Sequence, residues 1–519
     1  MIYRVLVTTS GIGNRLGDIT TYTNKSLVRV GDKPAISYII ESYPEETEFV
    51  VTVGHFADHI KQFLKLAYPK RSFTFVQVQN YSGPGSSLAY SILHAKDELQ
   101  CPFIFHACDT IVKNSIPEPT TNWLGGSSKD KASDHYVSFD VNDNLIVKIR
   151  DKGEFGGDYN YIGLAGINDY SKFFNHLQFK YTHNFNDSSL SDVSSIKQML
   201  SDSIFEYKEF EWYDIGNVES LQKTRKDLSS TLNVLDKNDE AIFIINNNII
   251  KFFYNSTIVN NRVKRATSHL KGLVPEITGF TSNFYQYKFV NGKVLADCIT
   301  EHVFKDYLQW AKNNLWEKQE LHGDFRQACF DFYFTKTKKR LEQFLEQSGI
   351  KDEECEINGI SVPSVADMLA KINIDTLCSG EPYRFHGDFI LDNTIKTKDG
   401  FKLVDWRQDF GGHIEAGDIY YDFAKLNHNL VFNHDIVSKN LFKISSKIKC
   451  DILRSNILVE CQKALFEFIE QNGFDVKKVG ILTAIIWINM APLHSHPLDI
   501  FLYYFGRYHL FKELIQEGQ

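Results

Sequence analysis

The pattern of apolar residues changes between residues 221 and 239, and this change is the strongest constraint on the fold. Before it, short apolar runs such as residues 5–7 and 49–53 alternate with helical stretches, which is typical of a mainly parallel sheet covered by helices on both faces. After it, strand pairs at 241–253 and 284–296 precede long amphipathic helices. The predicted division is a domain at 1–225, a linker at 226–239 and a second domain at 240–519.

Composition narrows the class of protein. The chain has 519 residues, of which 43% are hydrophobic and 24% charged, as in globular proteins. Its net charge of −8 opposes the neutralisation of nucleic-acid phosphates, so we expect no nucleic-acid partner. No apolar run reaches about 18 residues, so we expect no membrane span.

The cysteine pattern and the first residues indicate the cellular compartment in which the protein is expected. The eight cysteines include no CxxC pair, which excludes zinc-ribbon spacing and disfavours a disulfide framework. Residues 1–11 become polar too soon for a signal peptide. We therefore expect a cytoplasmic protein, and composition leaves its oligomeric state open, a homo-oligomer included.

A glycine-containing turn, TTSGIGNRL at residues 8–16, follows the first predicted strand. Backbone N–H groups near Gly11 and Gly13 can approach phosphate, and Arg15 and Lys25 can neutralise a triphosphate. Such a turn is also a common strand-to-helix connection. It lacks the third glycine of a dinucleotide-binding fingerprint, so a dinucleotide is not the expected ligand.

Three later motifs strengthen the nucleotide interpretation. The loop NYSGPGSSL at 80–88 precedes a helix and can surround a base or a phosphate, and Asp109 and Asp214 each follow a predicted strand. Two such carboxylates can share Mg²⁺ bound to a triphosphate, although each alone is more often a cap or turn residue. The candidate nucleotide-binding residues of the loop are Asn80, Gly85 and Ser86.

Taken together, these motifs resemble the sugar-nucleotide pyrophosphorylase and phosphocholine cytidylyltransferase superfamily over about residues 1–225. The resemblance implies an α/β, Rossmann-like nucleotidyltransferase domain of the GT-A kind. Lys152, in RDKG, falls where that family has a lysine that contacts the acceptor phosphate. The resemblance further implies that Gly11, Gly13, Arg15 and Lys25 hold the nucleotide phosphates and that Asp109 and Asp214 hold Mg²⁺.

This chain departs from the family pattern at three places. TTS replaces the usual AAG at residues 8–10, Cys108 replaces a glycine before Asp109, and Gly153 replaces a proline. The first two can alter base contacts or crowd the metal. CTP is the favoured nucleotide, because Asn80-Tyr81 before the Gly-Ser-Ser-Leu loop resembles the cytidylyltransferase version.

The strongest motif is FHGDFILDN at residues 385–393, followed by LVDWR at 403–407. Phosphoryl transfer to an alcohol needs a carboxylate near the attacking hydroxyl and oxygen ligands for Mg²⁺. Asp388, Asn393 and Asp405 supply these groups at a spacing that unrelated turn residues rarely reproduce.

These residues resemble the aminoglycoside phosphotransferase and choline kinase family, which has a protein-kinase-like α+β fold, over about residues 240–519. The resemblance implies that Asp388 is the catalytic base, that Asn393 and Asp405 bind Mg²⁺, and that Lys251 reaches the ATP phosphates. The chain lacks a Gly-rich loop before Lys251 and a glutamate in the helix that follows. In that family, residues matching Asp418 and Asp422 belong to a structural segment.

A second His-Gly-Asp ends at Asp324. Cys329 stands where the metal-binding asparagine is needed, so we interpret this motif as a helix boundary.

The leading hypothesis is a bifunctional enzyme that depends on Mg²⁺ in both domains. One half phosphorylates a small alcohol, amino alcohol or sugar with ATP. The other half transfers a nucleotidyl group from a second NTP, CTP favoured, to that phosphate, and gives an activated precursor for capsule or other surface polysaccharide or for lipid modification.

Two alternatives remain. One is an anomeric sugar kinase joined to an NDP-sugar pyrophosphorylase that uses UTP or GTP. The other is a nucleotidyltransferase joined to a noncatalytic kinase-like binding module.

Overall fold

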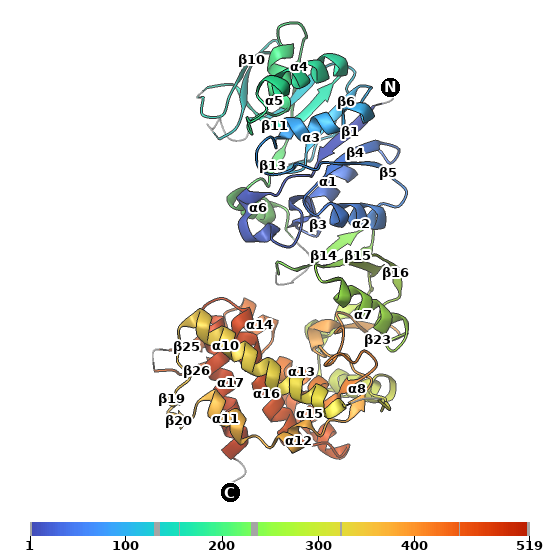
Figure 1. The fold of residues 1–519 in the computed structure, drawn as a ribbon. Helices are drawn as coiled ribbons and strands as arrows, with labels where there is room; N and C mark the ends of the chain where they lie inside the picture. The colour runs from blue at the N-terminus through green and yellow to red at the C-terminus, as the bar shows by residue number, and fades with distance from the viewer. Residues whose placement is uncertain are drawn as a thin grey trace. The chain divides into compact units, whose positions relative to one another are not determined.

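The computed structural model describes residues 3–128, 135–154, 156–229, 237–321, 324–445 and 447–515. The chain forms two compact units, shown with their elements in Figure 1. The first unit consists of Met1–Val259 and Thr278–Phe289, and the second of Asn260–Ile277 and Val290–Gln519.

The first unit is built on a nine-stranded sheet. Strands β5, β4, β1 and β6 run parallel, and β11 continues the sheet antiparallel to β6. This confirms the predicted α/β domain, but the sheet is mixed rather than mainly parallel, because β11 also pairs antiparallel with β8, and β10 pairs antiparallel with β12 and β9. In spatial order the strands are β5 (Ser72–Gln77), β4 (Glu48–Val53), β1 (Arg4–Thr8), β6 (Phe103–Ala107), β11 (Tyr159–Ile167), β8 (Trp123–Ser127), β12 (Glu206–Glu209), β10 (Leu145–Arg150) and β9 (Ser138–Asn142).

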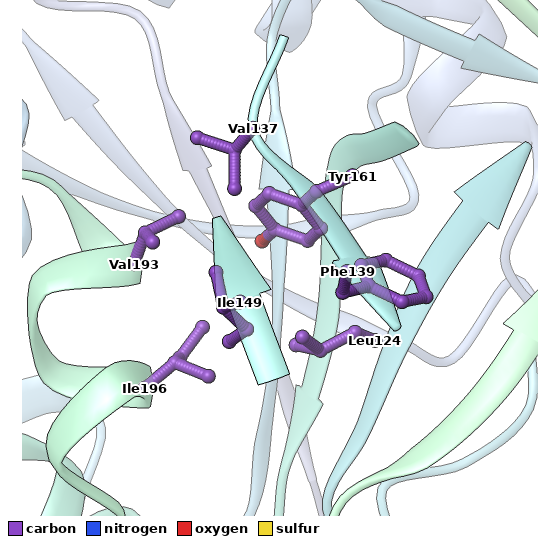
Figure 2. A pocket seen from close by; sticks show the side chains of 7 residues that line it. All are labelled: Leu124, Val137, Phe139, Ile149, Tyr161, Val193 and Ile196. Atoms are coloured by element: carbon purple, nitrogen blue, oxygen red, sulfur yellow. The ribbon is translucent and has the colours of Figure 1, made fainter. Parts of the chain in front are cut away.

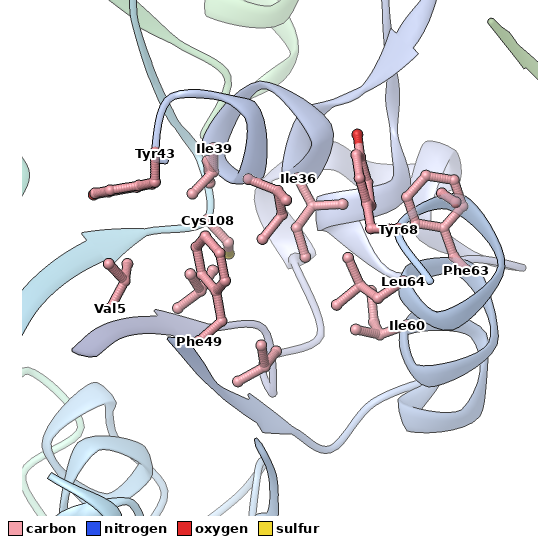
Figure 3. Close-up of a cluster of buried hydrophobic side chains, with 14 of the residues drawn as sticks. Val5, Ile36, Ile39, Tyr43, Phe49, Ile60, Phe63, Leu64, Tyr68 and Cys108 are labelled. Carbon is pink, nitrogen blue, oxygen red and sulfur yellow. The ribbon is translucent and has the colours of Figure 1, made fainter. Parts of the chain in front are cut away.

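Both faces of the parallel strands are buried, which explains their continuous apolar runs. Val5 and Val7 belong to the core under α1 (Ala35–Glu41) and α2 (Ala57–Ala67), drawn in Figure 3. Leu6 points to the other core, which is covered by α3 (Leu88–His94), α4 (Tyr170–His183) and α5 (Asp192–Met199).

The carboxyl ends of β1 and β6 lie at the same edge of the sheet, because Thr8 is in register with Ala107. The loops that follow these two strands carry the predicted phosphate and metal residues. The remaining elements of this unit are η1 (Asn14–Thr20), η2 (Lys25–Leu27), β2 (Arg29–Val30), β3 (Lys33–Pro34), η3 (Lys96–Glu98), β7 (Thr110–Val112), β13 (Trp212–Asp214) and α6 (Val218–Asp227).

A second, four-stranded sheet has the order β14 (Glu240–Ile245), β15 (Asn248–Phe253), β17 (Phe284–Lys288) and β16 (Ile277–Phe280). The hairpin predicted at 241–253 is confirmed, with Asn246 and Asn247 in left-handed turn conformations at φ 49° and 60°. The hairpin predicted at 284–296 is wrong. The segment after Gly292 forms β18 (Lys293–Val294), which pairs with β22 (Thr394–Thr397) instead of β17.

The small sheet packs on α2 of the first unit. The ring of Phe63 on α2 lies 5.7 Å from that of Phe243 and 5.8 Å from that of Phe284. The first unit therefore includes residues 240–259, which the sequence pattern placed in the second domain. The linker predicted at 226–239 stays a prediction, and 230–236 lie outside the described residues.

The second unit is mostly helical. Its helices are α7 (Ser256–Thr267, entered from the first unit), α8 (Glu301–Asn314), α9 (Phe325–Phe330), α10 (Lys336–Ser348), α11 (Val365–Lys371), α12 (Ile374–Cys378), α13 (Ile419–Val431), α14 (His434–Ser438), α15 (Asn456–Gln471), α16 (Val476–Met490) and α17 (Leu498–Ile515), with shorter turns η4 (Leu295–Cys298), η5 (Asp331–Thr335), η6 (Leu391–Asn393) and η7 (Ala491–Leu493).

Short antiparallel strands complete the second unit. They are β18 with β22 and β23 (Gly400–Leu403), β19 (Cys355–Ile357) with β20 (Ile360–Val362), β21 (Pro382–Tyr383) with β24 (Gly417–Asp418), and β25 (Phe442–Ile444) with β26 (Cys450–Ile452).

One stretch in the described residues, Val476–Leu493, is long and apolar enough to cross a membrane, with a mean hydropathy of 1.4. Inside the fold, 67% of it is buried, and α16 packs on α13 and α17. A buried core helix has this same composition, so this stretch alone is weak support for a span.

Candidate active sites

The first glycine loop places Lys25 at the carboxyl end of β1. Gly13 has φ 80°, and a Cβ there would lie 2.9 Å from Cβ of Lys25, so only glycine fits. Asn24, which is fully buried, donates to the carbonyl oxygens of Thr9 and His55 at 2.8 and 2.7 Å. This amide fixes the turn that begins at Lys25, a role that the sequence analysis missed.

Asp109 forms ion pairs with both cations that are predicted to bind phosphate. Lys25 Nζ lies 3.3 Å and Arg15 Nη2 lies 3.8 Å from Asp109 Oδ2. Burial raises the pKa of Asp109, but the two cations outweigh it and hold the pKa below the ordinary value. Burial lowers the pKa of Lys25, yet Asp109 and Cys108 more than offset this, so the amine stays charged.

A short strand ladder brings Asp214 beside Asp109. Strands β7 and β13 pair with Asp214 opposite Thr110, and the N–H of Ile215 donates to the carbonyl oxygen of Asp109 at 3.1 Å. A Cβ on Gly216 would lie 3.1 Å from Asp214 Oδ1 and 3.4 Å from both Asp109 Oδ2 and Arg15 Nη2. The absence of a side chain at Gly216 thus leaves space between the two carboxylates.

This arrangement fits a magnesium ion. Two carboxylates with room between them suit a cation that completes its octahedron with substrate phosphates and water. The described residues contain no cluster of three or more His, Cys, Asp or Glu side chains that would form a site without substrate. Asp109 and Asp214 are the residues that would hold the ion, as a ligand set shared with a bound triphosphate.

Cys108, which stands where the family pattern has a glycine, lies next to Lys25. It is 2% exposed and packs in the apolar core with Val5, Ile39 and Phe49, as Figure 3 shows. Burial raises the pKa of its thiol to about 11, although the neighbouring amine of Lys25 opposes this rise. The cysteine therefore packs the sheet and also neighbours a predicted site residue.

The loop at 80–88 lies beside the first glycine loop. A Cβ on Gly54 would lie 2.8 Å from both the carbonyl oxygen of Ser10 and the ring of Tyr81. Asn80 donates to the carbonyl oxygen of Pro84 at 2.9 Å, and Ser86 Oγ donates to that of Gly83 at 2.6 Å.

The far end of this loop is fixed by α4. Gly85 has φ 80°, a conformation that favours glycine, and its carbonyl oxygen accepts from the hydroxyl of Tyr181 at 2.9 Å. The binding roles of Asn80, Gly85 and Ser86 stay predictions.

Lys152 lies on an exposed turn after β10. Among the described residues, no hydrogen bond or ion pair joins it to Asp109, Asp214 or Lys25. Its charge does act on Asp192, a buried carboxyl group that accepts from the hydroxyl of Tyr161 at 2.5 Å. Burial raises the pKa of Asp192 to about 6, partly opposed by Tyr161 and Lys152.

An apolar gap lies between Tyr161 and Val193 and their neighbours (Figure 2). It is too small to hold a water molecule, so it is a packing defect rather than a ligand site. The lining residues are Leu124, Val137, Phe139, Ile149, Tyr161, Val193 and Ile196.

In the second unit, Asp388 and Asn393 face each other across one loop. Asn393 Nδ2 donates to Asp388 Oδ2 at 3.1 Å and to its carbonyl oxygen at 3.0 Å. Lys425 Nζ on α13 lies 2.6 Å from the other carboxylate oxygen, Oδ1. Burial raises the pKa of Asp388, but Lys425 outweighs it, so the carboxylate is ionised at neutral pH. No sequence motif indicated a role for Lys425.

Asp405 lies beside the loop that carries Asp388 and Asn393. The N–H of Val404 donates to the carbonyl oxygen of Asn393 at 2.9 Å, which sets Asp405 beside that loop. Asp405 has φ 58°, and its Oδ1 accepts from Arg262 Nη1 of α7 at 2.6 Å. Because the amide donors of Asn393 point to Asp388, its Oδ1 remains an acceptor. Asn393 and Asp405 therefore offer the oxygen donors that suit Mg²⁺ together with nucleotide phosphates.

Buried charged side chains hold the loop that carries Asp388. Asp422 accepts from the N–H groups of His386 and Gly387 at 2.8 and 2.7 Å, and from Trp316 Nε1 at 3.2 Å. Burial raises the pKa of Asp422 to about 6, although these donors oppose it. Arg265, fully buried, donates to the carbonyl oxygens of residues 385, 386 and 407. Gly387 takes φ 88° within this cradle.

Lys251, which is 7% exposed, lies on β15 of the first unit, and its role at the ATP phosphates stays a prediction. Asp324 Oδ1 accepts from the N–H of Gln327 at 2.9 Å and caps α9. The interpretation of Asp324 as a helix-boundary residue is therefore confirmed, while His322 and Gly323 lie outside the described residues.

No protein-family model matches the chain. Over 120 residues the sequence is 28% identical to the choline-phosphate cytidylyltransferase of Streptococcus pneumoniae, a match covering 23% of this chain and 50% of that protein. The N-terminal part of the chain is homologous to nucleotidyltransferases. The chain spans about half the length of this curated relative.

Several solved structures match the chain over less than half of its length. They include the CTP:phosphocholine cytidylyltransferase from Streptococcus pneumoniae, at 18% identity and a TM-score of 0.37, covering 44% of this chain and 100% of that one. The inositol-1-phosphate CTP transferase from T. maritima has 17% identity and a TM-score of 0.35, covering 44% and 98%. A UDP-glucose pyrophosphorylase complexed with UDP-glucose has 16% identity and a TM-score of 0.37, covering 44% and 98%.

Proposed function

We propose that the first unit transfers CMP from CTP to the phosphate of a small acceptor and releases pyrophosphate. The observation that carries this proposal is the space at Gly216, bounded by Asp109, Asp214 and Arg15. Homology to a cytidylyltransferase supports the reaction class and favours CTP over UTP or GTP.

In this reaction an oxygen of the acceptor phosphate attacks the α-phosphorus of CTP. A new P–O bond forms there, the bond from the α-phosphorus to the bridging oxygen breaks, and pyrophosphate leaves. Arg15 and Lys25 are placed to bind the triphosphate and to stabilise the charge that develops on the leaving group. When bound, Mg²⁺ would neutralise triphosphate oxygens and favour in-line geometry.

We further propose that the second unit supplies the phosphate by acting as an ATP-dependent kinase. Asp388 accepts the proton of the acceptor hydroxyl, whose oxygen attacks the γ-phosphorus. The bond between the γ-phosphorus and the bridging oxygen breaks, and ADP leaves. Support comes from Asp388, Asn393 and Asp405, which one loop and the following strand end bring together. Here Mg²⁺ would offset the charge of the β- and γ-phosphates.

A noncatalytic second unit is the competing proposal. The ion pair of Arg262 with Asp405 favours it, because an active kinase needs Asp405 on the metal. ATP consumption with an acceptor decides between the two, since a binding module would consume none.

Mass spectrometry of the products tests the first proposal. The intact protein is incubated with each NTP and a panel of phosphorylated alcohols, amino alcohols and sugars. We expect a CDP-linked product with wild type, loss of about 10²-fold or more in Asp109→Asn and Asp214→Asn, and no loss in Glu219→Gln, an exposed acid on α6. Normal turnover in both aspartate variants would overturn the assignment.

A further inference from the structure

Cationic side chains from three elements gather beside Asp388, in excess of what the carboxylate needs. Lys336 Nζ, at the start of α10, lies 4.3 Å from the ring centre of Phe332, and Arg407 Cζ lies 4.8 Å from the same ring. Arg407 also packs on the catalytic loop, since a Cβ on Gly387 would lie 2.6 Å from its Cβ.

Lys425 closes this group on the other side. Its Nζ bonds Asp388 Oδ1 at 2.6 Å, and Tyr421, one turn earlier on α13, makes an edge contact with the ring of Phe332 at 4.8 Å. Arg340 follows Lys336 by one turn of α10. We call this set, Lys336, Arg340, Arg407 and Lys425, the basic cluster.

The cationic side chains of the basic cluster have too few neighbouring carboxylates to balance their charge. Among the residues described, no carboxylate oxygen lies within 4.0 Å of Lys336 or Arg340. The pKa of Lys336 is lowered well below its usual range by burial and by Arg407, Arg340 and Lys425, and Asp388 is the group that raises it. Burial and Arg407 likewise lower the pKa of Arg340. Partly buried like charges without counter-charge are unfavourable unless an anion binds.

The two oxygens of Asp388 separate the basic cluster from the candidate metal ligands. Asn393 bonds Oδ2, whereas Lys425 bonds Oδ1. The nucleotide phosphates are expected on the side of Asn393 and Asp405. The basic cluster therefore lies on the side from which the acceptor hydroxyl would approach.

We propose that the basic cluster binds an anionic group, phosphate or carboxylate, carried by the acceptor of the second unit. This inference rests on the proposed kinase function. A quaternary amine or an amino alcohol would meet like charges here, so the acceptor class is a hydroxy acid or a phosphorylated alcohol. Lys336 and Arg340 bind the anion, and Lys425 links it to the ionised Asp388 that takes the hydroxyl proton.

Calorimetric titration of the full chain with inorganic phosphate tests the anion site. The variants are the double substitution Lys336→Ala/Arg340→Ala and, as a matched control, Lys339→Ala, an exposed lysine on the same helix. Titrations are repeated with Mg²⁺ and a non-hydrolysable ATP analogue. We expect the double variant to bind phosphate at least tenfold more weakly at one site, the control to match wild type, and the analogue to leave that site available.

Each other result overturns the inference. Equal phosphate binding in all three proteins would show that the basic cluster is no anion site. Displacement of phosphate from the site by the analogue would assign the anion to the nucleotide's own phosphates. A separate measurement tests the kinase proposal itself. If Asp405→Asn leaves the binding of the ATP analogue unchanged, the kinase proposal fails.

Acceptor preference provides a second readout. ATP consumption is compared for glycerol, its anionic counterparts glycerate and glycerol 3-phosphate, and the cation ethanolamine. We expect at least a tenfold higher kcat/KM for an anionic compound, and in the double variant a higher KM for that acceptor with an unchanged KM for ATP. Preference for glycerol or ethanolamine contradicts the inference, and if no compound is used the phosphate titration decides.

Discussion

The Nζ of Lys25 lies 3.3 Å from Asp109 Oδ2, in a pair that the chain assembles from loops 84 residues apart. The lysine helps to keep Asp109 ionised, and in the proposed reaction it would add positive charge at the triphosphate. Replacing it by methionine keeps the apolar stem but leaves the carboxylate without its nearest cation.

We expect Lys25→Met to lower pyrophosphate release by about 10²–10³-fold, the usual effect of removing one preorganised charged donor. Lys172→Met is the control, because Lys172 forms an exposed pair with Asp202. A variant with wild-type release at saturating CTP would remove Lys25 from the site.

Gly216→Ala tests the space between the carboxylates. The backbone there does not require glycine, but the new methyl group would lie 3.1 Å from Asp214 Oδ1 and 3.4 Å from Asp109 Oδ2. We expect nucleotidyl transfer to fall by about 10²-fold or more with little change in the unfolding temperature, because the methyl displaces bound ion or phosphate rather than core packing. Retained activity together with unchanged Mg²⁺ dependence would place the reaction elsewhere.

Asp192 predicts a pH dependence of stability. Its pKa is about 6 in the folded protein against an ordinary value of 3.8, so between these values the folded state holds a proton that the unfolded chain releases. The free energy of unfolding therefore falls as pH rises from about 4 to about 6 and is flat above, by ~3 kcal/mol at most for this group.

Urea unfolding of wild type and Asp192→Asn at several pH values isolates this contribution, since other titrating groups cancel in the difference. We expect the asparagine variant to lose this part of the slope. Tyr161→Phe should extend the slope to higher pH, because the tyrosine hydroxyl holds the pKa of Asp192 down. Parallel curves for all three proteins would show that Asp192 titrates normally.

Asp388 and Asp324 each end a His-Gly-Asp motif, but their replacement by alanine should have different effects. We expect Asp388→Ala to lower ATP consumption by about 10²–10⁴-fold, as for loss of a positioned base, while CMP transfer to a supplied phospho-acceptor is retained. Asp324→Ala removes the cap of α9 and should cost about 1 kcal/mol in stability with unchanged turnover.

ATP consumption and CMP transfer are measured on the same preparations of both variants. An inactive Asp324→Ala beside an active Asp388→Ala would reverse the assignment. Equal loss of both reactions in Asp388→Ala with the fold intact would contradict two separate sites.

The features of the fold that depend on local sequence pattern could be predicted. Strands such as β1 and β6 are apolar on both faces because helices cover both, so their runs are visible in the sequence. The sequence placed Asp109 and Asp214 at two strand ends. The pair β7–β13, a separate two-stranded sheet that brings Asp214 beside Asp109, was not predicted.

Ion pairs between residues that are distant in sequence could not be predicted. Arg262 meets Asp405 across 143 residues, and Lys425 meets Asp388 through the packing of α13, which no local spacing indicates. The hairpin expected at 284–296 was wrong for the same reason. An Asn-Gly turn is a local signal, but pairing of Val294 with Ile395 decides where that strand goes.

The packing of Phe243 and Phe284 on Phe63 also bears on how such a chain could be divided in evolution or in the laboratory. A gene cut at residue 239 would encode a first protein whose α2 presents bare aromatic and aliphatic side chains to water, and a second that starts with an unsupported β-hairpin. Exposed apolar surface of this kind promotes aggregation. Division of the chain into two genes at this point would therefore require compensating polar substitutions on α2.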